Sequence, residues 1–322
     1  MDDLDLRLLD EFQRDLPLCP QPFAAIGAAL RLTESAVIDR LIRLRDNGQV
    51  ARVGGTVRPN TAGASTLAAM AVPEGQIEDI AALVGAEPGV NHSYLREADW
   101  NLWFVATAAD RDDLGALLDR LRIASGQQLL DLRLVRPFNI DLGFRLTGGL
   151  CAMPSDRPPL PYQLHPGDGA LLHELSAGLA LTPRPFAALA ETLGRDESAV
   201  IARIAVLLAA GIITRLGVIV RHRALGFTAN AMVVWDAAPE QAEAAGRALA
   251  AHPGVTLAYE RQPVPGLWPW RLYSMIHARS RSEALGVLEA ATRLPALQGM
   301  AYRVLFSTRC FKQTGARLRR AA

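Results

Sequence analysis

Cysteine is scarce in this sequence of 322 residues. The three that occur, Cys19, Cys151 and Cys310, lie far apart, and none belongs to a CxxC pair. With three scattered cysteines, neither a disulfide framework nor a cysteine-rich metal site is expected. Widely spaced cysteines are typical of a reducing compartment, and we expect a cytoplasmic protein.

Long apolar runs and a basic leader segment are missing as well. The longest apolar run, residues 204–213, is far shorter than the ~20 residues that a membrane-spanning helix needs. The chain starts with the acidic stretch MDDLDLRLLDEF, whereas a signal peptide starts with a basic region. No membrane partner is therefore expected.

An excess of charge of either sign is also absent, because 34 basic residues face 33 acidic ones. This balance excludes a general polyanion binder, which carries a strongly basic surface. The halves differ: residues 1–150 hold 15 basic and 21 acidic residues (net −6), and residues 151–322 hold 19 and 12 (net +7). Lys312 is the only lysine. Such arginine usage follows from genomic base composition or from a need for guanidinium groups, which fork onto carboxylates.

The standard catalytic signatures do not occur. The sequence has no GxSxG, no P-loop, no GxGxxG turn, no HExxH and no zinc-ligand set. Neither a metal nor an organic cofactor is therefore predicted. Any chemistry has to depend on side chains that these motifs do not mark.

An internal repeat organises the chain. Shifting the sequence by 163 residues aligns residues 8–60 with residues 171–223 at about 23 identities and without a gap. The match resumes between EPGVNHSYLRE (from Glu87) and HPGVTLAYERQ (from His252), and between WNLWF (from Trp100) and WRLYS (from Trp270). A match of this length indicates a tandem duplication.

Each repeat combines two kinds of domain, so the predicted fold class is α+β. Three helical segments and a β-ribbon predict a winged helix-turn-helix; Thr33 and Asp196 are the expected caps of the third helices. The order β-α-β-β-α-β that follows predicts a ferredoxin-like domain. The predicted domains are a winged helix-turn-helix at 1–60, a ferredoxin-like domain at 61–150, a Pro/Gly-rich linker at 151–165, a second winged helix-turn-helix at 166–223 and a second ferredoxin-like domain at 224–322.

This combination resembles the Lrp/AsnC family of transcription regulators, and DNA binding is one candidate function. A reading helix must present polar and basic side chains to the major groove and the phosphates. In the second repeat that helix reads IARIAVLLAA, with Arg203 as its one basic residue. The first repeat has Arg40, Arg43 and Arg45 beside Asp39 and Asp46. DNA is therefore not the partner we favour.

The densest candidate site lies on two predicted hairpins. The segments NHSYLREADWNLWFV (from Asn91) and AYERQPVPGLWPWRLYSMIH (from Ala258) hold four of the five tryptophans. Strand alternation places His92, Tyr94 and Arg96 on one face. One interpretation is structural: aromatic side chains packed on the face of a sheet, with a few charged residues at its rim, give the same pattern. The alternative is a wall for a flat, aromatic, polyanionic ligand.

At these residues a closer resemblance emerges. HSYLREADWNLWF with the preceding PGV, VIVRHRALGF followed by ANAMVVWD, and LFSTRCFKQTGARL resemble the siroheme decarboxylases. These are Lrp/AsnC-like proteins of heme d1 biosynthesis and of the alternative heme pathway. The likeness covers essentially the whole chain, with an N-terminal D-type half fused to a C-terminal L-type half.

The resemblance implies a carboxy-lyase that removes two acetate carboxyls from siroheme to give didecarboxysiroheme. It requires a proton donor that works near neutral pH and arginines that hold the unreactive carboxylates. The candidates for proton transfer are His92, Tyr94, Tyr259 and His277. The candidates for substrate binding are Arg58, Arg96, Trp100, Trp103, Arg221, His222, Arg261, Trp270, Arg303 and Lys312, with His222 also a candidate ligand of the substrate's iron.

The implied partners are siroheme, a second copy of the chain in a dimer, and homologous decarboxylase subunits; iron belongs to the substrate. His92 aligns with Leu257 and His277 with Thr107, so the two halves cannot carry identical sites. Which half carries the working site stays open. A tetrapyrrole sensor without catalysis is a further alternative.

Overall fold

The computed structural model describes residues 1–140, 143, 146 and 162–315, and the chain divides into two compact units. Of the described residues, the first unit contains 1–62, 143, 146 and 162–225, and the second contains 63–140 and 226–315. Like parts of the two repeats are therefore grouped together. Most of the predicted linker, up to residue 161, lies outside the described residues.

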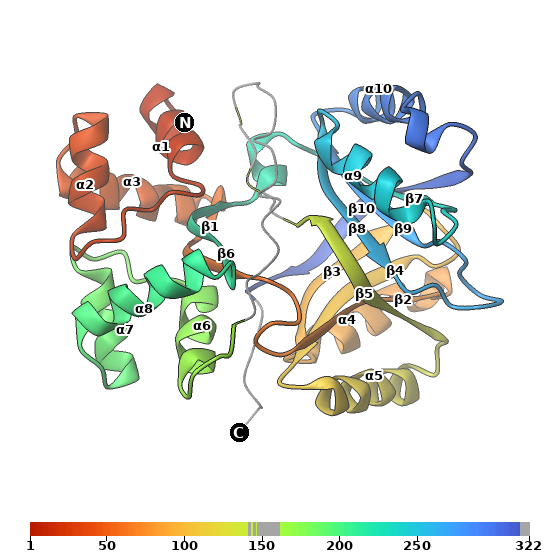
Figure 1. Cartoon of the computed structure of the whole chain (residues 1–322), viewed down its shortest axis with the longest axis horizontal. Helices are drawn as coiled ribbons and strands as arrows, with labels where there is room; N and C mark the ends of the chain where they lie inside the picture. The colour runs from red at the N-terminus through yellow and green to blue at the C-terminus, as the bar shows by residue number, and fades with distance from the viewer. Residues whose placement is uncertain (141–142, 144–145, 147–161, 316–322) are drawn as a thin grey trace. The chain divides into compact units, whose positions relative to one another are not determined.

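The first unit holds the two winged helix-turn-helix motifs (Figure 1). Its elements are α1 (Asp3–Glu11), α2 (Pro22–Leu30), α3 (Glu34–Asp46), β1 (Val50–Val57), α6 (Asp168–Ala177), α7 (Pro185–Leu193), α8 (Glu197–Ala209), β6 (Ile213–Val220) and the 3-10 turn η2 (His222–Leu225). Thr33 caps α3, since its hydroxyl accepts a hydrogen bond from the Ala36 amide at 3.2 Å. Asp196 stands at the cap position of α8, but its side chain makes no capping hydrogen bond there.

The two wing strands, β1 and β6, pair with each other in an antiparallel ribbon. Gly54 pairs with Gly217, its own counterpart in the repeat. The pair on one side, Val53–Val218, is equivalent by the repeat to the pair on the other side, Gly55–Leu216. The ribbon thus has a pseudo-two-fold axis at the glycine pair. A Cβ atom on Gly54 would lie 2.4 Å from the Leu175 carbonyl oxygen, so only glycine permits this approach.

The second unit is built on one closed sheet of eight strands in the order β10-β3-β4-β2-β5-β8-β9-β7. Its elements are β2 (Ala64–Met70), η1 (Glu74–Gln76), α4 (Ile77–Ala86), β3 (Val90–Arg96), β4 (Leu102–Ala108), α5 (Arg111–Ser125), β5 (Leu129–Asn139), β7 (Ala229–Trp235), α9 (Ala242–Ala251), β8 (Val255–Arg261), β9 (Leu272–Ala278), α10 (Arg281–Thr292), η3 (Pro295–Leu297) and β10 (Tyr302–Gln313). Each repeat supplies four neighbouring strands in the ferredoxin-like order. The pairs β10–β3 and β5–β8 join the two halves.

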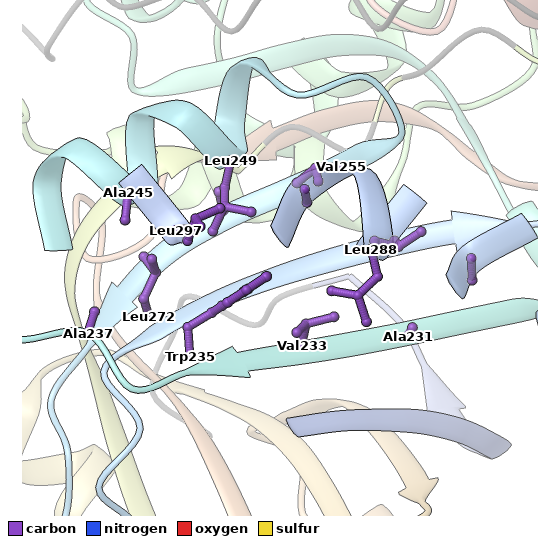
Figure 2. Close-up of a cluster of buried hydrophobic side chains, with 14 of the residues drawn as sticks. Ala231, Val233, Trp235, Ala237, Ala245, Leu249, Val255, Leu272, Leu288 and Leu297 are labelled. Atoms are coloured by element: carbon purple, nitrogen blue, oxygen red, sulfur yellow. The ribbon is translucent and has the colours of Figure 1, made fainter. Parts of the chain in front are cut away.

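The helices cover the outer face of the closed sheet. Figure 2 shows the second repeat, where Leu249 of α9 and Leu288 of α10 lie over Trp235, Val233 and Leu272 of the strands. In the first repeat α4 and α5 bury the equivalent face. Strand alternation then directs every second side chain to the inside of the closed sheet, which we call the interior.

The predicted fold class is confirmed: the chain is a tandem repeat of a winged helix-turn-helix and a β-α-β-β-α-β domain. None of the helices in the described ranges is both long and apolar enough to span a bilayer. The joining of both ferredoxin-like halves into one closed sheet was not predicted. Because of that joining, both repeats contribute side chains to one interior, which is the candidate functional site.

Candidate active site in the interior of the closed sheet

Two arginines point into the interior from equivalent strands. Arg96, at the end of β3, is 6 % exposed and donates a hydrogen bond to the Leu305 carbonyl oxygen at 2.9 Å. Arg261, at the end of β8, donates to the Leu132 carbonyl oxygen at 2.7 Å. Leu305 and Leu132 are themselves equivalent, on β10 and β5. Each arginine therefore reaches the last strand of the other repeat.

Neither guanidinium group forms an ion pair with a residue that the structure describes. The Nε atoms of Arg96 and Arg261 are both buried and without a hydrogen-bond partner. Burial lowers the pKa of Arg96 to about 10. Burial also lowers the pKa of Arg261, although Tyr259, Tyr273 and Asp131 each act to raise it. Buried charges in proteins are normally paired. Two unpaired cations in one interior are the arrangement expected of a site for an anion with several charged groups.

Aromatic rings are packed in the same interior. The Arg96 guanidinium lies 5.7 Å from the Tyr94 ring centroid, and the Arg261 guanidinium lies 4.6 Å from that of Tyr259. Tyr259 stacks on Tyr273 at 5.7 Å, and the Trp103 and Trp268 rings meet edge to face at 5.3 Å. The interior cluster consists of Leu67, Ala69, Trp103, Leu130, Leu132, Met232, Val234, Tyr259, Trp268, Tyr273, Met275 and Leu305.

A chain of hydrogen bonds runs from Arg96 to the backbone of β9. Arg96 NH2 donates to the Asn230 side-chain oxygen at 3.2 Å, and the Asn230 amide nitrogen lies 2.8 Å from His277 Nε2. His277 Nδ1 lies 2.7 Å from the Thr256 hydroxyl, which donates to the Met275 carbonyl oxygen at 3.1 Å. The chain joins a residue of the first repeat to three elements of the second.

The donor and acceptor roles in this chain assign the state of His277. Arginine only donates, so the Asn230 oxygen faces Arg96 and the amide NH2 group faces His277. His277 Nε2 must then accept, and Nδ1 carries the proton that it donates to Thr256. Burial, and next the charge of Arg96, lower the pKa of His277 to about 4. With these hydrogen bonds, His277 is therefore neutral near pH 7.

Arg96, Asn230 and His277 form one layer of the interior, and the equivalent layer around Arg261 contains different side chains. Strand register places Ser65 opposite Thr107, where the first layer has Asn230 opposite His277. It also places Leu134 opposite Arg261, where the first layer has Ser307 opposite Arg96. Polar groups beside the arginine are thus concentrated in the layer of His277.

The predicted residues of the first hairpin lie together on β3 and β4 or between them. The His92 and Tyr94 rings stack at 6.4 Å, and His92 Nδ1 lies 3.1 Å from the Asn91 side-chain oxygen. Trp103 is buried in the interior and donates to the Trp100 carbonyl oxygen at 2.6 Å. The structure therefore brings Tyr94, Arg96 and Trp103 to one interior, as the strand alternation predicts.

The remaining predicted residues of the second unit lie nearer its surface. Arg303 is exposed, and its guanidinium lies 5.6 Å from the ring of Trp270, which packs against the interior cluster. Lys312 Nζ donates to the carbonyl oxygens of Gly85 and Glu87 at 2.7 and 3.1 Å. Lys312 thus caps the carboxyl end of α4, a role that the sequence did not indicate.

Three predicted binding residues belong to the first unit. Arg58 follows β1 and donates through Nε to the Gly211 carbonyl oxygen at 2.8 Å. The Arg221 amide donates to the Gln49 carbonyl oxygen at 2.8 Å, and His222 begins the short turn η2 and is buried. Their substrate-binding roles stay predictions.

Metal binding gains no support from side-chain clustering. Within residues 1–140 and 162–315, no three histidine, cysteine, aspartate or glutamate residues group as metal ligands would. An iron held by a substrate macrocycle does not need a cluster of three protein ligands, so this finding leaves the prediction for His222 untested.

Two of the three arginines of α3 form ion pairs with Asp5 of α1, whereas Arg45 pairs with Asp46 of its own helix. Arg40 NH1 and Arg43 NH2 each lie 2.7 Å from an oxygen of Asp5, whose side chain is fully buried. In the second repeat Arg203 binds Asp168 through two hydrogen bonds, at 2.8 and 2.6 Å. These arginines fasten the third helix to the first. Arg40, Arg43 and Arg203, which a DNA-binding surface would use, thus already form ion pairs, and the two wing strands pair with each other.

Two residues of the hydrogen-bond chain, Asn230 and Thr256, were not predicted from the sequence. Asn230 and Thr256 occupy strand positions whose counterparts are Ser65 and Asn91, and neither belongs to a known motif. A signal was present for Asn230, because it is a polar residue at an inward position of the otherwise apolar strand ANAMVVW.

Comparisons with known proteins agree with this architecture. The family described as AsnC-like ligand binding domain matches residues 62–138 and 224–312, and the siroheme decarboxylase NirDL-like HTH domain matches residues 5–50 and 168–213. The siroheme decarboxylase NirDL subunit of Paracoccus denitrificans is 61 % identical over 322 residues, which cover 100 % of this chain and 99 % of that protein. The NirD subunit of Stutzerimonas stutzeri is 44 % identical over 146 residues, covering 45 % of this chain and 96 % of that protein.

The fold also matches solved structures. A crystal structure of the siroheme decarboxylase NirDL has a TM-score of 0.70 at 24 % identity and covers 98 % of this chain and 94 % of its own. A second structure, of that protein in complex with an iron-uroporphyrin III analogue, has a TM-score of 0.68 at 24 % identity, covering 98 % and 93 %. At this identity the match concerns the fold.

Proposed function

Because the chain belongs to the siroheme decarboxylase family, we propose that it is a carboxy-lyase that removes two acetate carboxyl groups from siroheme. The observation that carries the proposal is the pair Arg96 and Arg261, two cations without an ion-pair partner among the described residues, in an aromatic interior. Full-length identity of 61 % to a siroheme decarboxylase NirDL subunit supports the same reaction.

The substrate's chemistry matches the interior. Siroheme is a flat macrocycle with eight carboxylates, so most of its carboxylates must be held without reacting. Arginine suits this task because its fork matches a carboxylate and it stays protonated. The rings of Tyr94, Tyr259 and Trp103 offer flat apolar surface beside the two guanidinium groups. One octacarboxylate ligand would supply counter-charges for both arginines.

The reaction needs no oxidant and no added cofactor. In each decarboxylation the bond between the methylene carbon and the carboxylate carbon breaks, and carbon dioxide leaves. The bonding electron pair stays on the methylene carbon, delocalised into the macrocycle, and a proton then converts the methylene into a methyl group. The protein must therefore supply a proton and a water-poor surrounding. His92, Tyr94, Tyr259 and His277 are the proposed sources of the proton.

We further propose the place and the partners of the reaction. Iron enters as part of the substrate, and the product serves heme d1 formation. The two halves correspond to subunits that occur as separate chains in other organisms, such as the NirD subunit of Stutzerimonas stutzeri. Association of the chain with a second copy or with homologous subunits, in the cytoplasm, is the arrangement we infer.

Anaerobic incubation with siroheme tests the function. We expect release of two molecules of carbon dioxide per siroheme and a product that has lost two carboxyl groups by mass spectrometry. Tight binding of siroheme that is recovered unchanged would instead identify a tetrapyrrole sensor and overturn the enzymatic proposal.

A further inference from the structure

Asn230 stands between two groups that compete for its single side-chain oxygen. In the ligand-free protein that oxygen accepts from Arg96 at 3.2 Å, and the amide NH2 group faces His277 Nε2 at 2.8 Å. A protonated His277 would carry a proton on Nε2, which would meet the NH2 group, donor against donor. Turning the amide over would serve His277 but would set the NH2 group against Arg96. Arg96 and a protonated His277 cannot both be satisfied.

We propose that Asn230 is a positioning residue that relays carboxylate binding at Arg96 to His277. A carboxylate on Arg96 replaces the Asn230 oxygen, the amide group turns over, and its oxygen then accepts a hydrogen bond from a protonated His277 Nε2. This inference rests on the proposed function, because it takes a substrate carboxylate as the ligand of Arg96. It assigns the proton donor's activation to the layer of Arg96, Asn230 and His277.

Two physical effects drive the exchange. A carboxylate forms a charge-assisted, bidentate contact with a guanidinium group, which is stronger than the neutral amide contact that it replaces. The bound negative charge also offsets the charge of Arg96, which disfavours protonation of His277 in the ligand-free protein. Carboxylate binding therefore removes both obstacles to protonation at the same time.

The charged groups that face His277 come from the elements of the described chain that pack around it. From β3, Arg96 faces it across Asn230; from β7 and β8, the facing side chains Asn230 and Thr256 are neutral. Tyr259 lies farther along β8, and Arg279, directly after the end of β9, lies over the Phe227 ring at 4.8 Å. On the helices behind the sheet, the charged side chains are exposed: Glu243 and Arg247 on α9, and Arg281, Glu283 and Glu289 on α10. Arg96 is thus the charge whose neutralisation His277 should sense.

The other half lacks this relay. In the layer of Arg261, Ser65 and Thr107 occupy the positions of Asn230 and His277, so that layer has no imidazole to protonate at this position. A carboxylate bound at Arg261 is therefore held without a proton donor being activated beside it. The two arginines would divide the task, one binding a carboxylate beside the proton donor and one anchoring the macrocycle.

The direct test is the protonation state of His277 in the whole protein. Histidine labelled with nitrogen-15 reports by NMR which ring nitrogen carries a proton, and the His277→Gln spectrum identifies this signal among the six histidines. The probe is metal-free uroporphyrin III, a diamagnetic octacarboxylate. We expect the neutral Nδ1–H form without the probe, and a rise of about one pKa unit or more with it.

Two substitutions separate the relay from a structural role. Asn230→Asp supplies an oxygen to both neighbours at once, so His277 should be protonated without the probe and respond little to it. In the decarboxylation assay this variant should shift the alkaline limb of the pH profile to higher pH. Asn230→Ser, which copies the counterpart Ser65, should reduce the response of His277 to the part that comes from neutralising the charge of Arg96. Ser65→Ala is the matched control and should leave the response of His277 as in the unchanged protein.

The outcomes distinguish the two proposals. If uroporphyrin quenches tryptophan fluorescence on binding but the His277 signal does not shift, the relay is wrong and the proposed function stands. If uroporphyrin does not bind at all, the proposed function fails, and the relay fails with it. If Asn230→Ser responds to the probe as fully as the unchanged protein does, Asn230 is not the positioning residue.

Discussion

Arg96 and Arg261 each donate a hydrogen bond across the boundary between the repeats, to the carbonyl oxygens of Leu305 and Leu132 at 2.9 and 2.7 Å. The duplication thus produced two equivalent buried cations in one interior. They differ in their neighbours, since Asn230 and His277 accompany Arg96 while Ser65 and Thr107 accompany Arg261.

Arg261→Met tests whether the buried charge serves a ligand. Replacing a desolvated cation by an apolar side chain of similar length costs little stability, whereas it removes a carboxylate contact. We expect the affinity for uroporphyrin III to fall at least about tenfold, the loss typical of one charged hydrogen-bonding group. Fluorescence titration measures this loss. Arg133→Met, on the partly exposed pair with Asp131, is the control, and an equal loss there would contradict the assignment.

The pH dependence of unfolding reports on His277. Its folded pKa of about 4 lies below the unfolded value of about 6.5, so between these values the unfolded chain binds a proton that the folded protein does not. Stability contributed by neutral His277 is complete above pH ~6.5 and is lost as the pH falls toward 4, by at most about 3 kcal/mol. The free energy of unfolding, measured with urea between pH 4 and 7, should therefore rise less steeply with pH in His277→Gln than in the unchanged protein. An unchanged slope would mean that His277 takes up its proton normally in the folded protein.

The ion pair between Asp168 and Arg203 should be essential for the first unit. The Asp168 side chain is 2 % exposed, and removing one partner leaves a buried charge, at a cost of about 3–5 kcal/mol. We expect such a loss in Asp168→Asn by chemical denaturation, and a smaller loss in the double variant Asp168→Leu with Arg203→Met. Burial raises the pKa of Asp168, but the hydrogen bonds from Arg203 and the His165 amide outweigh it and lower the pKa below its usual value. This stability should therefore be lost as the pH falls below ~3.8.

Asp119→Asn is the control for that prediction, because the Asp119 contact with Arg122 is exposed at both ends. An exposed pair contributes little. A loss in Asp119→Asn as large as that in Asp168→Asn would contradict the distinction between the two pairs.

The glycines at the centre of the wing ribbon should tolerate no side chain. A Cβ atom would lie 2.4 Å from the Leu175 oxygen at Gly54 and 2.2 Å from the Gln13 oxygen at Gly217. Backbone must shift to admit either methyl group, so we expect each alanine variant to lose about 1–3 kcal/mol or more. Gly115→Ala, in α5 with nothing within 4 Å, should gain about 0.5–1 kcal/mol. Thermal unfolding of the three variants measures these changes.

The first unit should not bind DNA. Arg40 and Arg43 are held by Asp5, Arg203 is held by Asp168, and the wings pair with each other. We expect no retention of random-sequence duplex DNA in a gel-shift experiment at low salt, where nonspecific phosphate contacts are strongest. Retention that weakens steeply with salt would show that other basic residues form an electrostatic DNA surface.

Much of the architecture was readable from the sequence because a duplication repeats its own signals. The 163-residue shift, the third-helix segments and the strand order of each ferredoxin-like domain all correspond to observed elements. His92, Tyr94 and Arg96 share a strand face, as alternation predicts, and Arg96 is indeed buried. Hydrophobic periodicity carries this information within a single element.

What could not be predicted depends on contacts between distant segments. The pairs β10–β3 and β5–β8 join different repeats, and nothing in either strand names its partner. Lys312 looks like a basic tail residue in the sequence, yet it caps α4 through Gly85 and Glu87. Asn230 acquires its meaning only once Arg96, more than a hundred residues earlier in the chain, lies beside it.

The most direct test of the whole account is single-turnover conversion of siroheme in deuterated water, under anaerobic conditions, followed by mass spectrometry. We predict a product that has lost two carboxyl groups as carbon dioxide and carries one deuterium in each new methyl group. The deuterium would come from a proton donor that exchanges with solvent. Recovery of intact siroheme, bound but unchanged, would contradict the account.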